Sequence, residues 1–242
     1  MDLTISWLYG TKMNIYGDRG NVLALAQRAR WRGIAVRTVE VGLGEPLPPE
    51  SDVFFFGGGQ DQEQVAVSRD LQGAKGDALK QAIADGAGML AVCGGYQLLG
   101  QEYRPHDAAP LPGIGLFDLV TEAGAERFIG NVVVETDLPF GELVGFENHS
   151  GLTHLGPTAT PLGRVRVGRG NNGQDGTEGA VLGNAIGCYL HGALLPKNPA
   201  LADWLLLAGL RRRHGDVALP PLDDTAELAA HATAVDRAVR TR

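Results

Sequence analysis

The stretch that most constrains this fold is GMLAVCGGYQLLG, from Gly88 to Gly100. Its apolar run stops at Cys93, meets two glycines and resumes with helical spacing, which predicts a buried strand, a sharp turn and a helix. The two glycines permit a tight backbone that a side chain forbids, so the thiol would be presented at the strand end, as in a nucleophile elbow. The unpaired N–H groups of the first helical turn would favour a thiolate and stabilise an oxyanion beside it.

A second glycine turn follows another predicted strand. The segment DVFFF has a short apolar run that ends in Gly57–Gly59. Glycines at this place would let a ligand approach the backbone and meet N–H donors, and an ordinary glycine turn is an equal alternative. The cysteine has a similar alternative, because a thiol at a strand end is just as often a small filler of the core.

The order of the elements predicts the fold class. DLTISWLY and IAVRTVEV have the branched and aromatic residues of strands, and NVLALAQRARWRG between them has the apolar spacing of a helix. This order is typical of a right-handed parallel crossover, and a further helix is predicted from Leu71 to Asp85. Beyond the elbow, IGLFDLVTE, RFIGNVVVE and RVRVG predict antiparallel strands. We therefore expect an α/β fold with a mostly parallel central sheet, added antiparallel strands and a single domain over residues 1–242.

Composition excludes several classes of function. The 242 residues carry a net charge of −7 and the sequence pI is near 5.3, which argues against binding nucleic acid through a basic surface. No apolar run approaches the roughly 20 residues that span a bilayer, and the first residues do not resemble a signal peptide. We expect neither a membrane span nor export. Two cysteines, Cys93 and Cys188, do not require a disulfide framework and fit a reducing cytoplasm.

A histidine follows another predicted strand. The segment NAIGCYLHGALLPKNP predicts a short buried strand that ends at His191 and runs into a glycine. Because ligands bind beyond the carboxyl ends of parallel strands, His191, Cys93 and the glycine turns would share one crevice. An imidazole there could take the thiol proton and pass it to a leaving group, although a histidine at a strand end is more often structural. Cys188, on the same strand, is more simply core filler.

Together these segments resemble a known enzyme family. Cys-Gly-Gly-Tyr-Gln resembles the C-x-G-x-Q elbow of class I glutamine amidotransferases, and Tyr-Leu-His-Gly matches the histidine region of their cobyric acid synthase-like (CobB/CobQ) branch. The resemblance implies a flavodoxin-like, three-layer α/β/α fold in which Cys93 attacks the side-chain amide of glutamine and His191 transfers protons. The further residues that it implies are the oxyanion-hole glycines Gly58, Gly59 and Gly94 and the substrate-binding Gln97 and Arg127.

The chain departs from that family at one position. Many class I members carry a glutamate two residues after the histidine, where this sequence has Ala193. Either the cysteine and histidine work as a pair, or another carboxylate, such as Glu147 in GFENHSG, orients the imidazole. His149 and His154 in the same stretch fit no common zinc spacing, so no metal site is expected.

The resemblance also implies a partner. Amide synthesis from a carboxylate needs ATP, and no G-x-x-x-x-G-K-[ST] phosphate-binding loop is present, so ATP and Mg²⁺ are expected on another subunit and no cofactor in this chain. Within the branch, the chain looks like the stand-alone glutaminase subunits. These form a heterodimer with a Mur-ligase-like synthetase that amidates the α-carboxyl of D-isoglutamate in lipid II, a peptidoglycan precursor.

Other interpretations stay open on the sequence. The ammonia could serve a different acceptor of the cobyric acid type, or the chain could be another cysteine hydrolase on a flavodoxin-like fold. A non-catalytic module that binds a partner is a third alternative. The final segment, DDTAELAAHATAVDRAVR, predicts an amphipathic helix with Leu228, Ala232 and Val235 on one side, packed on the core or on that partner.

Overall fold

A six-stranded sheet lies at the centre of the computed structural model, which describes residues 1–241 apart from the side chain of residue 61. Its strand order is β11-β12-β4-β3-β1-β2. All neighbouring strands run parallel except β11, which pairs antiparallel with β12 at one edge. The strands are β1 (Asp2–Leu8), β2 (Ala35–Val41), β3 (Val53–Phe56), β4 (Gly88–Val92), β11 (Ala180–Leu182) and β12 (Ala185–Cys188).

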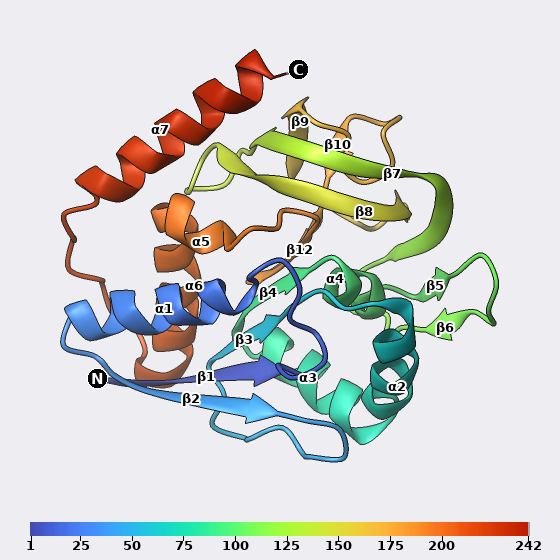
Figure 1. The fold of residues 1–242 in the computed structure, drawn as a ribbon. Helices are drawn as coiled ribbons and strands as arrows, with labels where there is room; N and C mark the ends of the chain where they lie inside the picture. The colour runs from blue at the N-terminus through green and yellow to red at the C-terminus, as the bar shows by residue number, and fades with distance from the viewer. Residues whose placement is uncertain (242) are drawn as a thin grey trace.

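Helices cover both faces of this sheet, which gives the predicted three layers (Figure 1). One layer holds α1 and α6, which pack on each other, and the other holds α2, α3 and α4. The central strands β3 and β4 are buried along their whole length, and this explains their unbroken apolar sequences. The helices are α1 (Arg19–Trp31), α2 (Asp61–Leu71), α3 (Ala74–Ala84), α4 (Gly94–Leu99), α5 (Leu194–Lys197), α6 (Pro199–His214) and α7 (Thr225–Arg240).

The chain between the second glycine turn and the elbow differs from the prediction of one helix from Leu71 to Asp85. It forms two helices, and α2 begins at Asp61, directly after the glycine turn. Gly73 separates them with a φ of 69°, a backbone conformation that a residue with a side chain rarely adopts. Helical spacing alone did not reveal α2, because its sequence DQEQVAVSRDL is largely polar.

The predicted antiparallel strands form a second sheet beside the carboxyl edge of the first. Its order is β10-β9-β7-β5-β6, and the long strand β8 pairs antiparallel with β7 (Figure 1). A backbone bridge between Phe146 on β8 and His191 after β12 connects the two sheets. The strands are β5 (Glu102–Arg104), β6 (Leu111–Pro112), β7 (Leu119–Glu135), β8 (Leu143–Leu155), β9 (Gly163–Val167) and β10 (Thr177–Glu178).

The last helix, α7, packs on this second sheet. Ala238 is buried with Val133, Val144 and Val167 in a small separate cluster, and Ala234 and Val235 pack against it. The predicted apolar face is therefore shifted, because Leu228 is 57% exposed. No helix among residues 1–241 is long and apolar enough to cross a membrane.

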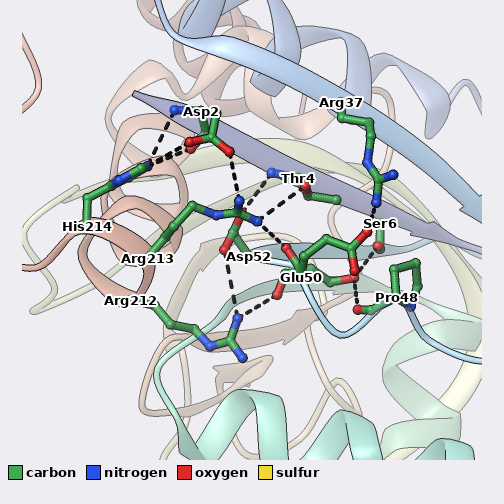
Figure 2. A network of polar contacts seen from close by, with 11 residues as sticks. Asp2, Thr4, Ser6, Arg37, Pro48, Glu50, Asp52, Arg212, Arg213 and His214 are labelled. Atoms are coloured by element: carbon green, nitrogen blue, oxygen red, sulfur yellow. Dashed lines mark hydrogen bonds and ion pairs between the residues drawn. The ribbon is translucent and has the colours of Figure 1, made fainter.

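A polar network ties α6 to the amino-terminal edge of the central sheet. Figure 2 shows Arg212 and Arg213 pointing toward Asp52, which is 2% exposed. Asp52 accepts the Thr4 backbone N–H at 2.8 Å, and an Arg213 nitrogen lies 2.8 Å from the same carboxylate. A buried carboxylate requires such partners, because unpaired it would be costly to remove from water. The network lies at the strand ends opposite Cys93, so it supports the fold without entering the site.

Candidate active site

Cys93 stands at the turn between β4 and α4, as the sequence predicts. Its φ is 52° and its ψ is −109°, a sparsely populated conformation for a residue with a side chain. Such strain concentrates at functional turns, where the surrounding structure enforces it. The turn requires a glycine at position 95, because a Cβ there would lie 2.6 Å from the Phe56 carbonyl oxygen. Cys93 is 7% exposed.

His191 lies beside this thiol. It follows β12 by three residues, and its backbone N–H donates to the Phe146 carbonyl oxygen at 2.8 Å, which fixes the chain at the ring. The imidazole is fully buried. A Cβ placed on Gly58 would lie 3.0 Å from His191 Cε1 and 3.3 Å from Cys93 Cβ, so both side chains converge on one point. The sulfur and the ring therefore meet across the carboxyl edge of the central sheet.

Asp18 completes the arrangement from the loop before α1. Its Oδ1 lies 3.3 Å from His191 Nδ1, and its Oδ2 accepts the Gly58 backbone N–H at 3.0 Å. The carboxylate is fully buried. Burial by itself lowers the pKa of His191, but the negative charges of Cys93 and Asp18 outweigh it and raise that pKa to about 10. His191 is therefore stabilised in its protonated form by the groups that face it.

Glu147, the alternative that the sequence offered to a cysteine–histidine pair, has other partners in the structure. Its oxygens accept the backbone N–H groups of Arg169 at 2.9 and 3.0 Å and of Gly170 at 3.0 Å. Glu147 therefore fixes the turn after β9, and Asp18 takes the place beside the ring. Ala193, at the position of the family's usual glutamate, lies against the start of α1, because a Cβ on Gly20 would lie 2.6 Å from the Ala193 Cβ.

The glycine turn after β3 contributes differently from the prediction. The Gly58 amide, expected in the oxyanion hole, is bonded to Asp18 instead. The Gly59 nitrogen would lie 3.1 Å from a Cβ placed on Gly94. Gly59 and Gly94 thus bring two backbone segments together beside Cys93.

A pocket of about 660 Å³ opens in front of the thiol. Gln97 lines it, and its side chain is oriented by a bond from Gln64 Nε2 at 2.9 Å and a bond to the Tyr189 hydroxyl at 3.1 Å. Arg127 lies at the exposed end of the pocket. Its Nε donates to Asn148 Oδ1 at 2.6 Å, and this bond aligns a guanidinium that can bind a carboxylate.

Most of the chain matches a known protein family. A family model for CobB/CobQ-like glutamine amidotransferase domains matches residues 4–199, which is most of the chain and includes Asp18, Cys93 and His191. The chain belongs to this family. Its matched part extends from the first strand to the start of α6, so the family match takes in the central sheet and all the site residues described above.

Curated relatives of the amidotransferase differ in length. It is 42% identical to the GatD subunit of lipid II isoglutaminyl synthase (glutamine-hydrolyzing) of Staphylococcus aureus (strain N315), covering 100% of this chain and 98% of that one. Identity to the same subunit of Streptococcus pneumoniae (strain ATCC BAA-255 / R6) is 38%, over 92% and 86% of the two chains. Cobyric acid synthase of Sphingopyxis alaskensis is 33% identical, over 81% of this chain but 40% of the relative.

Solved structures confirm the fold of the amidotransferase. The structure of PurLQS from Thermotoga maritima has a TM-score of 0.59 at 14% identity and covers 88% of this chain and 99% of that chain. A second glutamine amidotransferase structure has a TM-score of 0.55 at 15% identity, covering 84% and 98%. These likenesses establish the mixed α/β architecture that the sequence predicts.

Three side chains of the amidotransferase site were missed by sequence reasoning. Asp18 lies in Tyr-Gly-Asp-Arg-Gly-Asn, at the end of the loop that joins β1 to α1, and its position in a loop that follows a strand was the available signal. Tyr16 packs edge-on against His191 with ring centroids 5.0 Å apart, and its hydroxyl lies 3.3 Å from an Arg127 nitrogen. Gln64 belongs to α2, the helix that was not predicted.

A thiol, an imidazole and a carboxylate in series can perform acyl transfer through a covalent thioester. Among the residues that the structure describes, no three His, Cys, Asp or Glu side chains are grouped so that they could hold a metal ion. Cys188 is fully buried on β12, and burial raises the pKa of its thiol. It packs in the core as an uncharged group.

Proposed function

We propose that this chain, acting as one domain over residues 1–242, hydrolyses L-glutamine and supplies the ammonia to a partner synthetase. The observation that carries the proposal is the convergence of Cys93 and His191 on the point that a Cβ of Gly58 would occupy. Such a convergence gives a nucleophile and a proton carrier for the same carbonyl carbon. Family membership supplies the substrate class.

In the proposed reaction the Cys93 thiolate attacks the side-chain carbonyl carbon of glutamine. The N–H groups of Gly59 and Gly94 bind the oxygen as it becomes negative. The C–N bond then breaks, the nitrogen takes the proton from His191 and leaves as ammonia, and a thioester remains. His191, now neutral, removes a proton from water, which attacks the thioester and releases glutamate and the thiolate.

Arg127 and Gln97 hold the other end of the substrate in this proposal. The Arg127 guanidinium would bind the α-carboxylate, because a planar fork of donors matches that group. Gln97 lies on α4, the helix that follows Cys93, and has a fixed amide orientation. Hydrolysis by this set of groups requires no cofactor.

The acceptor that we propose is lipid II. Its support is the full-length identity of 42% to a subunit named for that synthase. Activation of the acceptor carboxyl needs ATP, and we assign ATP and Mg²⁺ to a Mur-ligase-like partner that forms a heterodimer with this chain. Because both glutamine and ATP are plentiful in the cytoplasm, we propose that the complex works there. Cobyric acid synthase is a weaker model, since this chain matches 40% of its length.

The first experiment is Cys93→Ala in the purified chain, with ammonia release from L-glutamine as the measurement. We expect release to be lost, together with covalent labelling by a diazoketone analogue of glutamine. Cys188→Ala is the matched control, because it removes the other cysteine from the same region, and both properties should persist. Unchanged ammonia release by Cys93→Ala would end the assignment.

The second experiment identifies the acceptor. The tagged chain is purified from its own cell and the co-purifying protein is sequenced, then the pair is given glutamine, ATP, Mg²⁺ and lipid II. We expect an ATP-dependent ligase and amidated lipid II. Recovery of a cobalamin enzyme, with no amidation of lipid II, would replace the proposed acceptor while leaving the glutaminase assignment intact.

A further inference from the structure

A second buried imidazole lines the same pocket. His149 lies on β8 and is 1% exposed. Its ring stacks on Tyr189 with centroids 3.6 Å apart and an interplanar angle of 7°, and Phe128 packs edge-on against it at 5.4 Å. Two aromatic neighbours hold the ring in one orientation, so its two nitrogens have fixed directions.

The hydrogen bonds of this ring define its tautomer. His149 Nδ1 lies 2.8 Å from the Gly151 carbonyl oxygen, which can only accept, so Nδ1 carries the hydrogen and Nε2 is an acceptor. Burial lowers the pKa of His149, and the hydrogen bond to Gly151 opposes this decrease. The positive charges of His191 and Arg127 act in the same direction as burial, and the resulting pKa is about 3. The ring is therefore neutral throughout the physiological range.

The acceptor nitrogen lacks a protein partner. Nε2 of His149 is buried and has no hydrogen bond to any residue from 1 to 241. An unsatisfied buried polar atom is costly, and in a pocket it is satisfied when a ligand binds. The surroundings specify the ligand group: His191 and Arg127 both act on this ring electrostatically, so a further cation there is unfavourable. A neutral N–H donor fits.

We infer that Nε2 of His149 accepts a hydrogen bond from the carboxamide N–H of glutamine and so selects an amide over an ester or a carboxylate. The inference rests on the proposed glutaminase function. His149 lines the same pocket as Cys93, and the positive charge of His191, the group proposed to protonate the same nitrogen, acts on its ring. An ester at that position offers no hydrogen, and the product carboxylate would turn a lone pair toward the lone pair of Nε2.

The test compares L-glutamine with L-glutamic acid γ-methyl ester, which gives the same thioester and loses methanol in place of ammonia. His149→Phe keeps an aromatic ring for the stack on Tyr189 and removes the acceptor. We expect kcat/KM for glutamine to fall about tenfold and kcat/KM for the ester to change less than about twofold. His154→Phe is the matched control, because this exposed histidine lies on the same strand, and both values should stay unchanged.

A second pair of variants covers the case in which His149→Phe does not fold. Gln and Met are similar in size, and Gln offers an acceptor oxygen where Met offers only a weak one. His149→Gln should retain more of the preference for the amide than His149→Met. An equal loss for both substrates in all variants would overturn the inference and indicate a structural role. Failure of the proposed function would look different, since the wild-type chain would then hydrolyse neither substrate.

Discussion

The imidazole of His191 and the carboxylate of Asp18 lie in contact, both fully buried, with Nδ1 3.3 Å from Oδ1. The same carboxylate accepts the Gly58 N–H through its other oxygen at 3.0 Å. Asp18 thus couples the ring to the glycine turn that borders Cys93. A neutral imidazole would then keep its hydrogen on Nδ1 and present Nε2 for the thiol proton.

Asp18→Asn is predicted to reduce the rate of the chemical step. The amide can still accept from Gly58, but its NH₂ group would face Nδ1 and favour the wrong tautomer, so kcat for glutamine should fall about 10²-fold. Loss of the negative charge should also lower the pKa of His191, which is raised by Cys93 and Asp18. An NMR titration of the His191 imidazole in the wild type and in Asp18→Asn measures this decrease.

The matched control for Asp18→Asn is Glu147→Gln, which alters another buried carboxylate. It should keep a kcat close to that of the wild type, with some loss of stability from weaker bonds to the turn at Arg169 and Gly170. The opposite pattern, an active Asp18→Asn and an inactive Glu147→Gln, would restore Glu147 as the residue that orients the ring.

Gly58→Ala is predicted to separate the reacting groups. The added Cβ would lie 3.0 Å from His191 Cε1 and 3.3 Å from Cys93 Cβ, so both side chains must move. A displacement on the scale of 1 Å can cost about 10²-fold in rate, so shifts of a few tenths of an ångström should lower kcat by a smaller factor, about threefold to tenfold. Gly130→Ala is the control, because its Cβ would meet nothing within 4 Å. A wild-type kcat in Gly58→Ala would contradict the close approach of the two side chains.

Arg127→Ala is predicted to weaken substrate binding. Hydrogen bonds to a charged group contribute about 1.5 to 3 kcal/mol, so KM for glutamine should rise about 10- to 100-fold while kcat changes little. Arg127→Lys should recover part of the loss, since it keeps the charge without the fork of donors. Arg104→Ala, an exposed arginine on β5, is the control. An unchanged KM in Arg127→Ala would leave the α-carboxylate to another residue.

Glu178→Gln is predicted to alter how stability depends on pH. Glu178 is fully buried, and burial raises its pKa to about 8 despite a bond from the Tyr189 N–H. The folded chain holds a proton that the unfolded chain releases near the ordinary glutamate value, so this stabilisation is complete below that value and is lost as the pH rises through about 8. Across that window the free energy of unfolding should fall by up to about 1.4 kcal/mol per pH unit relative to Glu178→Gln.

Urea unfolding of both proteins between pH 5 and pH 9 measures this difference. Glu126→Gln is the control, since Glu126 is exposed, and its curve should run parallel to that of the wild type. Parallel curves for Glu178→Gln and the wild type would mean that Glu178 titrates alike in the folded and unfolded states.

Local pattern was sufficient for the elements that carry the reactive groups. Short apolar runs followed by glycines predict the buried strands β3 and β4 and the sharp turns after them. These features can be predicted because they depend only on residues that are neighbours in the sequence. Helix α2 was missed because its polar sequence has little apolar spacing, and Gln64, which it carries, was missed with it. The sequence predicted an oxyanion-hole role for Gly58. It did not reveal that the Gly58 N–H donates to Asp18, because the two residues are 40 positions apart.

The sequence by itself determined the sheet class, the elbow at Cys93 and the placement of His191 at the same sheet edge, since all three follow from residues adjacent in the chain. Only the tertiary structure decided which carboxylate meets the imidazole. Asp18 and His191 are 173 positions apart, and nothing local to either one specifies the other. Their contact arises because parallel strands end at one edge of the sheet, where loops from distant parts of the chain must pack together and satisfy each other's buried polar atoms.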